Sequence, residues 1–144
     1  MKKIALLIVI VFSLYGYLDK NPGFLTSFSE QSATDDSALT SAIENRKSDV
    51  QVRGTGIVIH NLADDTTGSR HQKFILKLSS GKTLLISHNI DLAPRINSLR
   101  EGDTVNFYGE YEWNSKGGVV HWTHHDPRGN HVGGWLKHNG ATYQ

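Results

Sequence analysis

The stretch RHQKFILKLSSGKTLLIS, residues 70–87, contains two strands and the turn that joins them. Apolar and polar residues alternate along RHQKFILKL (70–78), which predicts a strand with one buried face. SSGK (79–82) has the composition of a hairpin turn, and TLLIS (83–87) reads as the returning strand. An antiparallel hairpin near the middle of the sequence therefore indicates a β fold.

The sequence on either side of this hairpin predicts further strands. VQVRGTGIVIH (50–60) precedes it, and TVNFYGEYEW (104–113) and VVHWTHH (119–125) follow it, the last two joined by a turn NSKGG. Between them, HNIDLAPRINSL (88–99) contains Pro94 and spaced apolar residues, so we expect a short helical plug there. The remainder of the chain is expected to be a loop rich in histidine and glycine.

The order of these elements is strand, strand, strand, helical connection, strand, strand. This is the order of the five-stranded OB-like barrel, and Gly54 and Gly56 lie where a long strand of such a barrel must bend. A generic five-stranded sheet is the alternative. We expect an all-β fold with one or two short helices, in which an OB-like barrel with a C-terminal histidine-rich loop occupies residues 50–144.

Residues 1–18 have the pattern of an export segment. Lys2 and Lys3 precede an apolar run, IALLIVIVFSLYGYL, that is shorter than the about 20 residues of a full membrane span. A cleaved signal peptide and an uncleaved membrane anchor both remain open. Either one places the domain in the periplasm or outside the cell, and an anchor would tether it to the inner membrane. Residues 19–49 are polar and predict a linker with a short helix that ends at Asn45.

The composition excludes several kinds of chemistry. The chain of 144 residues has no cysteine, which rules out disulfides, thiolate catalysis and cysteine-ligated zinc. Its net charge is +1 with histidine neutral, so charge alone neither requires nor excludes a polyanionic partner. Eight histidines are many for this length, and they direct attention to metal binding and proton transfer.

Several longer motifs carry a resemblance to a known family. GSRHQKFIL, HNIDLAPR, GDTVNFYGEYEWNSKGGVVHWTHHDP and GGWLKHNGATYQ resemble a bacterial family catalogued as domain of unknown function 3465, over about residues 52–144. The resemblance implies a small exported protein with an OB-like barrel. It implies no activity and no catalytic residue.

The motif HWTHHDP (121–127) is the densest group of candidate functional residues. In a regular strand, His121 and His125 would share one face with their Cα atoms about 13 Å apart, which is too far for one metal ion. A site for zinc or a similar divalent ion therefore needs histidines from other segments. The candidate metal ligands are His124, His131 and His138. The alternative is that these rings bond backbone carbonyls and close the end of the barrel.

Acid–base chemistry needs no metal. A histidine oriented by a carboxylate transfers protons near neutral pH, and an arginine fork binds phosphate. Glu110, Glu112 and Asp126 are the candidate orienting groups. The candidate catalytic residues are Arg70, His71, His121, His125 and Asp126. Together they predict a metal- or histidine-dependent hydrolase that acts on a phosphodiester or a similar anionic substrate.

A binding module without catalysis is the alternative. OB barrels bind single-stranded nucleic acid and oligosaccharides through aromatic platforms and basic edges. The candidate contact residues are Trp113, Trp122, Trp135 and Lys73, although rings in small barrels more often pack in the core. We favour the hydrolase because seven of the eight histidines, all but His60, lie in or beside these motifs. That function requires His71, one histidine of 121–125, and His131 or His138 to converge.

Overall fold

The computed structural model describes residues 37–144 of the protein. The expected export segment and much of the expected linker lie outside these residues. Within the described part, residues 37–44 are helical, and the strands are β1 (Val50–Asn61), β2 (His71–Leu78), β3 (Thr83–Asn89), β4 (Thr104–Glu112), β5 (Val119–His121), β6 (Trp135–His138) and β7 (Ala141–Tyr143). None of the described helical segments has the length and apolar character needed to cross a membrane.

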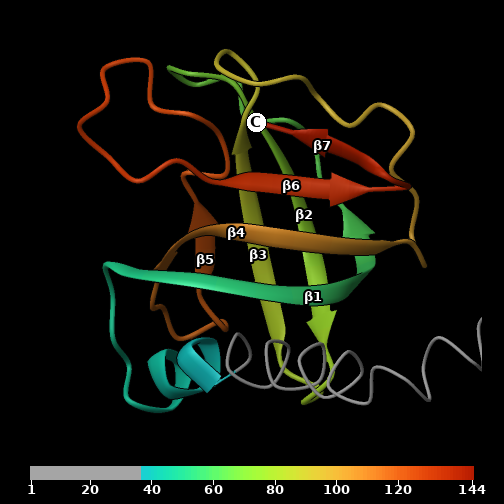
Figure 1. Ribbon diagram of the computed structural model, residues 1–144. Coiled ribbons are helices and arrows are strands. Elements are labelled where there is room, and N and C mark those ends of the chain that lie inside the picture. Colours follow the sequence, from blue (N-terminus) through green and yellow to red (C-terminus); the bar gives the residue numbers. More distant parts are fainter. Residues whose placement is uncertain (1–36) are drawn as a thin grey trace, which may run out of the picture. The chain divides into compact units, whose positions relative to one another are not determined.

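Five of these strands close into a barrel (Figure 1). β1 pairs with β2, β2 with β3, and β4 with both β1 and β5, all antiparallel, while β3 and β5 close the ring as a parallel pair. This order confirms the expected all-β fold with a five-stranded OB-like barrel. In Figure 1, β1, β4 and β6 cross the front of the view, and β2 and β3 run behind them in another direction.

The core lies inside this barrel and consists of the side chains at alternate strand positions, which point inward. Phe74 and Leu76 of β2 are fully buried, as the alternation of their strand predicts. Burial of one such side chain stabilises the fold by about 1.5–3 kcal/mol. On β1, a Cβ at Gly54 would lie 2.7 Å from the ring of Phe107, so this glycine leaves room for the buried ring of β4.

The expected helical plug at 88–99 is wrong. β3 extends to Asn89, and the residues after it form turns and bends with no helix. Ile96 and Leu99 still fill the core. The buried side chain of Gln72 explains how, because its amide donates to the Ile96 carbonyl at 3.0 Å and accepts from the Ile96 N–H at 2.9 Å. The backbone N–H and C=O of Ile96 are therefore satisfied by a side chain of β2.

The expected strand at 119–125 is wrong beyond residue 121. β5 ends at His121 because Trp122 takes a left-handed conformation, with φ of 54°, that ends extended structure. Thr123 is buried and His125 is exposed, so they do not continue one face of a strand. The C-terminal residues expected to be a loop also contain β6 and β7. Strands this short carry too few alternating residues for a period to be recognised.

Candidate functional site

The chain leaves the barrel after β5 and returns to the same edge of β4. Along that edge, His121 lies opposite Glu110 and Trp135 lies opposite Tyr108, so β5 and β6 occupy consecutive positions beside β4. Residues 122–134 therefore form a loop whose two ends meet at one point of the sheet, seen in orange in Figure 1. We call this segment the histidine loop.

Gly134 closes the neck of the histidine loop. Its N–H donates to the carbonyl of His124 at 2.9 Å. A Cβ at residue 134 would collide with the carbonyl oxygens of Trp122 and Tyr108. Only glycine therefore fits at the point where the loop rejoins β4.

Asp126 orders the far part of the histidine loop. Its carboxylate accepts the N–H groups of Arg128, Asn130 and His131 at 3.0, 2.7 and 3.0 Å. The bond from Arg128, followed by the other two, holds the pKa of Asp126 below its ordinary value. The ring of His131 stacks on Trp122 with centroids 3.9 Å apart. These contacts give Asp126, a predicted catalytic residue, the role of positioning His131.

Glu110, Glu112 and His121 form the strongest candidate site of the described residues. β4 presents both glutamates on its outer face, and β5 places His121 directly opposite Glu110. Nε2 of His121 lies 3.5 Å from Oε1 of Glu110 and 3.6 Å from Oε1 of Glu112. One ligand atom of each residue lies within 4.8 Å of the other two, a spacing that can hold a metal ion. We call these three residues the metal cluster.

The distances within the metal cluster fit a cation better than hydrogen bonds. Nε2 of His121 is buried and has no hydrogen-bond partner among the residues that the structure describes. Separations of 3.5 and 3.6 Å are too long for charge-assisted hydrogen bonds. Two ligand atoms placed about 2.1 Å from a tetrahedral zinc ion are about 3.4 Å apart. The ring nitrogen and the two carboxylates are therefore spaced as ligands of one ion would be.

His131 reaches Glu110 from the histidine loop. Its Nε2 lies 2.5 Å from Oε2 of Glu110, the oxygen that does not face His121, and its Nδ1 donates to the Val132 carbonyl at 2.8 Å. Burial opposes protonation of His131. The Val132 carbonyl and the carboxylates of Glu110 and Asp126 outweigh that effect and raise the pKa of His131. His131 thus fixes the orientation of the Glu110 carboxylate.

Asp49 adds a further carboxylate at the edge of the metal cluster. The side chain of Glu112 beside it raises the pKa of Asp49, first through a hydrogen bond and then through charge repulsion. Three carboxylates and two imidazole rings therefore gather at this end of β4. A divalent cation would neutralise such a concentration of negative charge.

The other predicted metal ligands lie away from the metal cluster. His124 is 4% exposed, and its Nδ1 donates to the carbonyl of His125 at 2.7 Å. His138 is buried and bonds Asp103 at 2.7 Å, just before the start of β4 and about 23 Å along the chain direction from Glu110. Of the three predicted metal ligands, His131 alone contacts the metal cluster.

The predicted catalytic residues are divided between two regions. Arg70 donates to the Asp91 carboxylate from its backbone N–H at 2.8 Å and from its Nε at 2.7 Å. His71 begins β2, which pairs with β1 and β3, whereas His121 faces β4. His125 is an exposed residue of the histidine loop. The structure therefore brings His121 and His131 to one carboxylate and leaves Arg70 and His71 at another strand. The expected convergence of His71 with these two histidines is wrong, so a hydrolytic site at this carboxylate has to work without His71.

The buried His88 of β3 bonds the first part of the histidine loop. Nε2 of His88 donates to the Pro94 carbonyl at 3.1 Å, so its Nδ1 accepts the hydroxyl of Thr123 at 2.8 Å. Burial lowers the pKa of His88 to about 4. This ring is therefore neutral at neutral pH, and it joins β3 to the start of the loop.

The predicted binding residues do not form one surface. Trp135 lies on β6 beside Tyr108, whereas Trp122 stacks inside the histidine loop. Trp113 packs against the edge of the core, and Lys73 lies on β2. Of the predicted binding residues, Trp135 alone lies on a strand that pairs with β4, the strand that carries Glu110 and Glu112.

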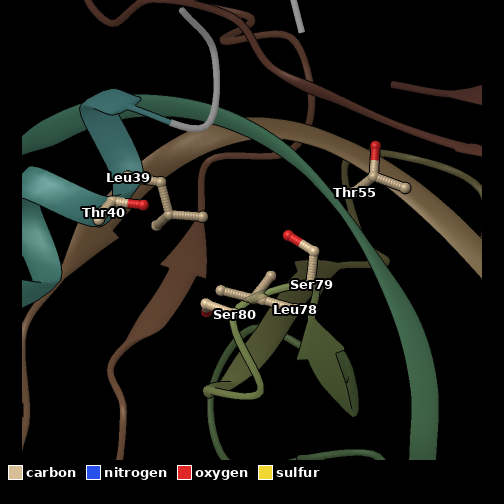
Figure 2. Close-up of a pocket in the computed structure, with 6 residues that line it drawn as sticks. All are labelled: Leu39, Thr40, Thr55, Leu78, Ser79 and Ser80. Carbon is tan, nitrogen blue, oxygen red and sulfur yellow. The ribbon is translucent and has the colours of Figure 1, made fainter. Parts of the chain in front are cut away.

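Figure 2 shows a hollow of about 240 Å³ between the helix at 37–44 and the barrel. Its lining consists of Leu39, Thr40, Thr55, Leu78, Ser79 and Ser80. These side chains include no titratable group, so the hollow offers neither an acid–base residue nor a charged ligand for a metal.

Sequence reasoning named Glu110 and Glu112 as orienting groups and did not identify them as ligands. A signal was present in the sequence. Glu110 and Glu112 are two residues apart on a strand and so share a face, and the NSKGG turn returns the chain to them at His121. Asp49 and Val132 gave no such signal, because their positions depend on loop conformations.

The family described as protein of unknown function (DUF3465) matches residues 23–144. A search among curated proteins finds no match.

Proposed function

We propose that this chain, which belongs to the DUF3465 family of proteins of unknown function, binds a divalent cation at Glu110, Glu112 and His121 and hydrolyses a phosphodiester or a similar anionic ester. The observation that carries the proposal is the buried, unpartnered Nε2 of His121 within the described residues, aimed at two carboxylate oxygens. A neutral imidazole with carboxylates suits zinc, manganese or a similar ion.

Three protein ligands leave further coordination positions open, as in hydrolytic metal sites. A bound cation would activate a water molecule and stabilise negative charge on the ester. The residues of the chain set the geometry. His131 holds Glu110 from the side opposite His121, and the Val132 carbonyl fixes the ring of His131. A histidine locked in this way is a typical partner of a ligand carboxylate.

Two side chains near the metal cluster are suited to an anionic ester. Gln51 lies opposite Glu110 on β1, and its Nε2 is a buried donor without a partner among the described residues. Arg53 follows two residues later on the same strand face and carries the positive charge that a phosphate requires. Gln51 would donate to an ester oxygen, and Arg53 would balance its charge.

We also propose that the reaction takes place outside the cytoplasm. The support is the lysine pair and apolar run of residues 1–18, which have the pattern of an export segment. Localisation of a reporter fused after the full chain, compared with a chain that lacks residues 1–18, tests this. Equal cytoplasmic fluorescence from both fusions would contradict it.

Hydrolysis of bis(p-nitrophenyl) phosphate tests the proposed reaction. We expect turnover by the full-length protein with zinc or manganese, loss of turnover in EDTA, and more than about a tenfold loss in Glu112→Gln. Glu101→Gln is the matched control, because Glu101 is an exposed glutamate beside His60 and away from the metal cluster. Equal activity of Glu112→Gln and Glu101→Gln would contradict the proposal. Activity that survives EDTA but requires His121 would favour the histidine-dependent alternative.

A further inference from the structure

The metal cluster is one end of an ordered outer surface on β1, β4 and β6. Directly opposite residues of paired strands share a face, and positions two apart along a strand do so as well. The first row across the strands is Gln51, Glu110 and His121; the second is Arg53, Tyr108 and Trp135; the third is Thr55, Asn106 and Lys137. The residues between these rows point inward and are buried.

The second and third rows combine aromatic rings with positive charge. The rings of Tyr108 and Trp135 lie 6.0 Å apart, tilted by 37°. The guanidinium of Arg53 lies 4.8 Å from the Tyr108 centroid and 5.6 Å from that of Trp135, and Nζ of Lys137 lies 4.5 Å from Trp135. We call Arg53, Tyr108, Trp135 and Lys137 the cationic platform.

The cationic platform adjoins the metal cluster directly. Tyr108 and Glu110 are two residues apart on β4, a separation of about 7 Å along the strand. At its other end the surface continues into an open hollow of about 550 Å³, whose lining includes Asn106, Lys137 and Thr142. A ligand bound on the platform would therefore reach the cluster at one end and a polar hollow at the other.

We propose that the cationic platform binds single-stranded nucleic acid and presents its phosphodiester backbone to the metal cluster. The inference rests on the proposed function for the cleavage step, but not for binding. Rings and cations that lie side by side on one surface match a chain in which flat bases alternate with phosphates. Lys137 is exposed, and its ammonium group lies over the Trp135 ring. A nucleic-acid base could take the place of this ammonium group and stack on the ring. The displaced ammonium group of Lys137 would then contact a phosphate of the nucleic acid.

Fluorescence anisotropy of labelled dT12 and U12 with the full-length protein in EDTA tests binding without cleavage. We expect both oligonucleotides to bind, with a slope of log K against log salt of about −1.4, which corresponds to two phosphates at about −0.7 each. Lys137→Ala should lower the magnitude of that slope by about 0.7. Lys82→Ala is the matched control, because Lys82 is an exposed lysine in the β2–β3 turn, and it should leave the slope unchanged.

Substitution of the ring separates stacking from charge. Trp135→Ala should weaken binding by at least about tenfold, and Trp135→Phe, which keeps a ring, should recover most of the affinity. If Trp135→Ala fails to fold, the Lys137→Ala and Lys82→Ala pair still decides the question, because both side chains are exposed.

Several outcomes would overturn the inference. These are absence of oligonucleotide binding, an equal salt slope in Lys137→Ala and the wild type, and displacement of the oligonucleotide by a neutral oligosaccharide such as maltohexaose. Two outcomes distinguish failure of this binding inference from failure of the proposed hydrolase. Oligonucleotide binding in EDTA without hydrolysis after addition of metal would contradict the hydrolase and support the platform. Hydrolysis of bis(p-nitrophenyl) phosphate without oligonucleotide binding would do the reverse.

Discussion

His121 and Trp135 pair with residues of β4 that are only two positions apart, although residues 122–134 separate them in the chain. His121 pairs with Glu110, and Trp135 pairs with Tyr108. The histidine loop therefore leaves one edge of β4 after His121 and returns to the same edge at Trp135. Because its ends meet at one point, the loop returns His131 to the Glu110 carboxylate that β5 has already placed beside His121.

Gly134→Ala should destabilise the protein through the neck of this loop. The added Cβ would collide with two carbonyl oxygens that belong to the backbone and cannot rotate away. We expect the free energy of unfolding to fall by about 2 kcal/mol or more, measured by urea denaturation. Gly129→Ala is the control. Gly129 has φ of 66° and open space around it, so only the backbone cost of about 1 kcal/mol applies. Equal losses in both variants would contradict the close approach at residue 134.

Asp126→Asn should weaken metal binding although Asp126 does not touch the metal cluster. The carboxylate holds three N–H groups of the loop that carries His131, and an amide oxygen holds them less strongly. We expect affinity for zinc to fall by about tenfold, the size typical of groups that orient ligands. Asp65→Asn serves as control, since that carboxylate accepts a single N–H, from Thr67, in another loop. Identical zinc affinities in the two variants would remove the positioning role of Asp126.

Stability should fall between about pH 6.5 and pH 4 because of His88. Its folded pKa of about 4 lies below the ordinary value of 6.5, so the unfolded chain binds the proton first as pH falls. The contribution of His88 to the free energy of unfolding is fully present above pH 6.5. It declines towards pH 4, by about 3 kcal/mol in total. His88→Gln should show a shallower decline in this window when the free energy of unfolding is measured against pH.

Other groups act outside that window or cancel in the comparison of the two proteins. The carboxyls of Asp64 and Asp126 have pKa values held below 3.8, so their contributions are lost only at lower pH. The raised pKa of His131 contributes stability that is lost as pH rises above 6.5. An identical slope for wild type and His88→Gln between pH 6.5 and pH 4 would show that burial of His88 is not the cause.

The barrel could be predicted because its signals are local. Alternation at 70–78 and 104–113, and the hairpin turns after them, specify strands from a few neighbouring residues. The conformation of the 88–99 connection could not be predicted, because Gln72, 24 residues before Ile96 in the chain, binds both backbone groups of Ile96. The end of β5 at Trp122 could not be predicted either. The left-handed Trp122 lies beside Gly134, and its neighbour Thr123 bonds His88, and both partners are distant in the sequence.

The candidate site was predicted in part for the same reason. His121, His131, Glu110 and Glu112 were all singled out as candidate groups from the sequence, and the structure places them together. Their division into ligands and supporting residues depends on strand register and loop closure. His124 and His138 have ligand chemistry, but burial and bonds to the His125 carbonyl and Asp103 hold them elsewhere.

The most direct test of the metal cluster is calorimetric titration of zinc into the full-length protein, stripped of metal and free of a histidine tag. The account predicts one ion per chain, with affinity reduced by more than about tenfold in Glu110→Gln and unchanged in Glu101→Gln. No binding by the wild type, or equal affinity of the wild type and Glu110→Gln, would contradict it.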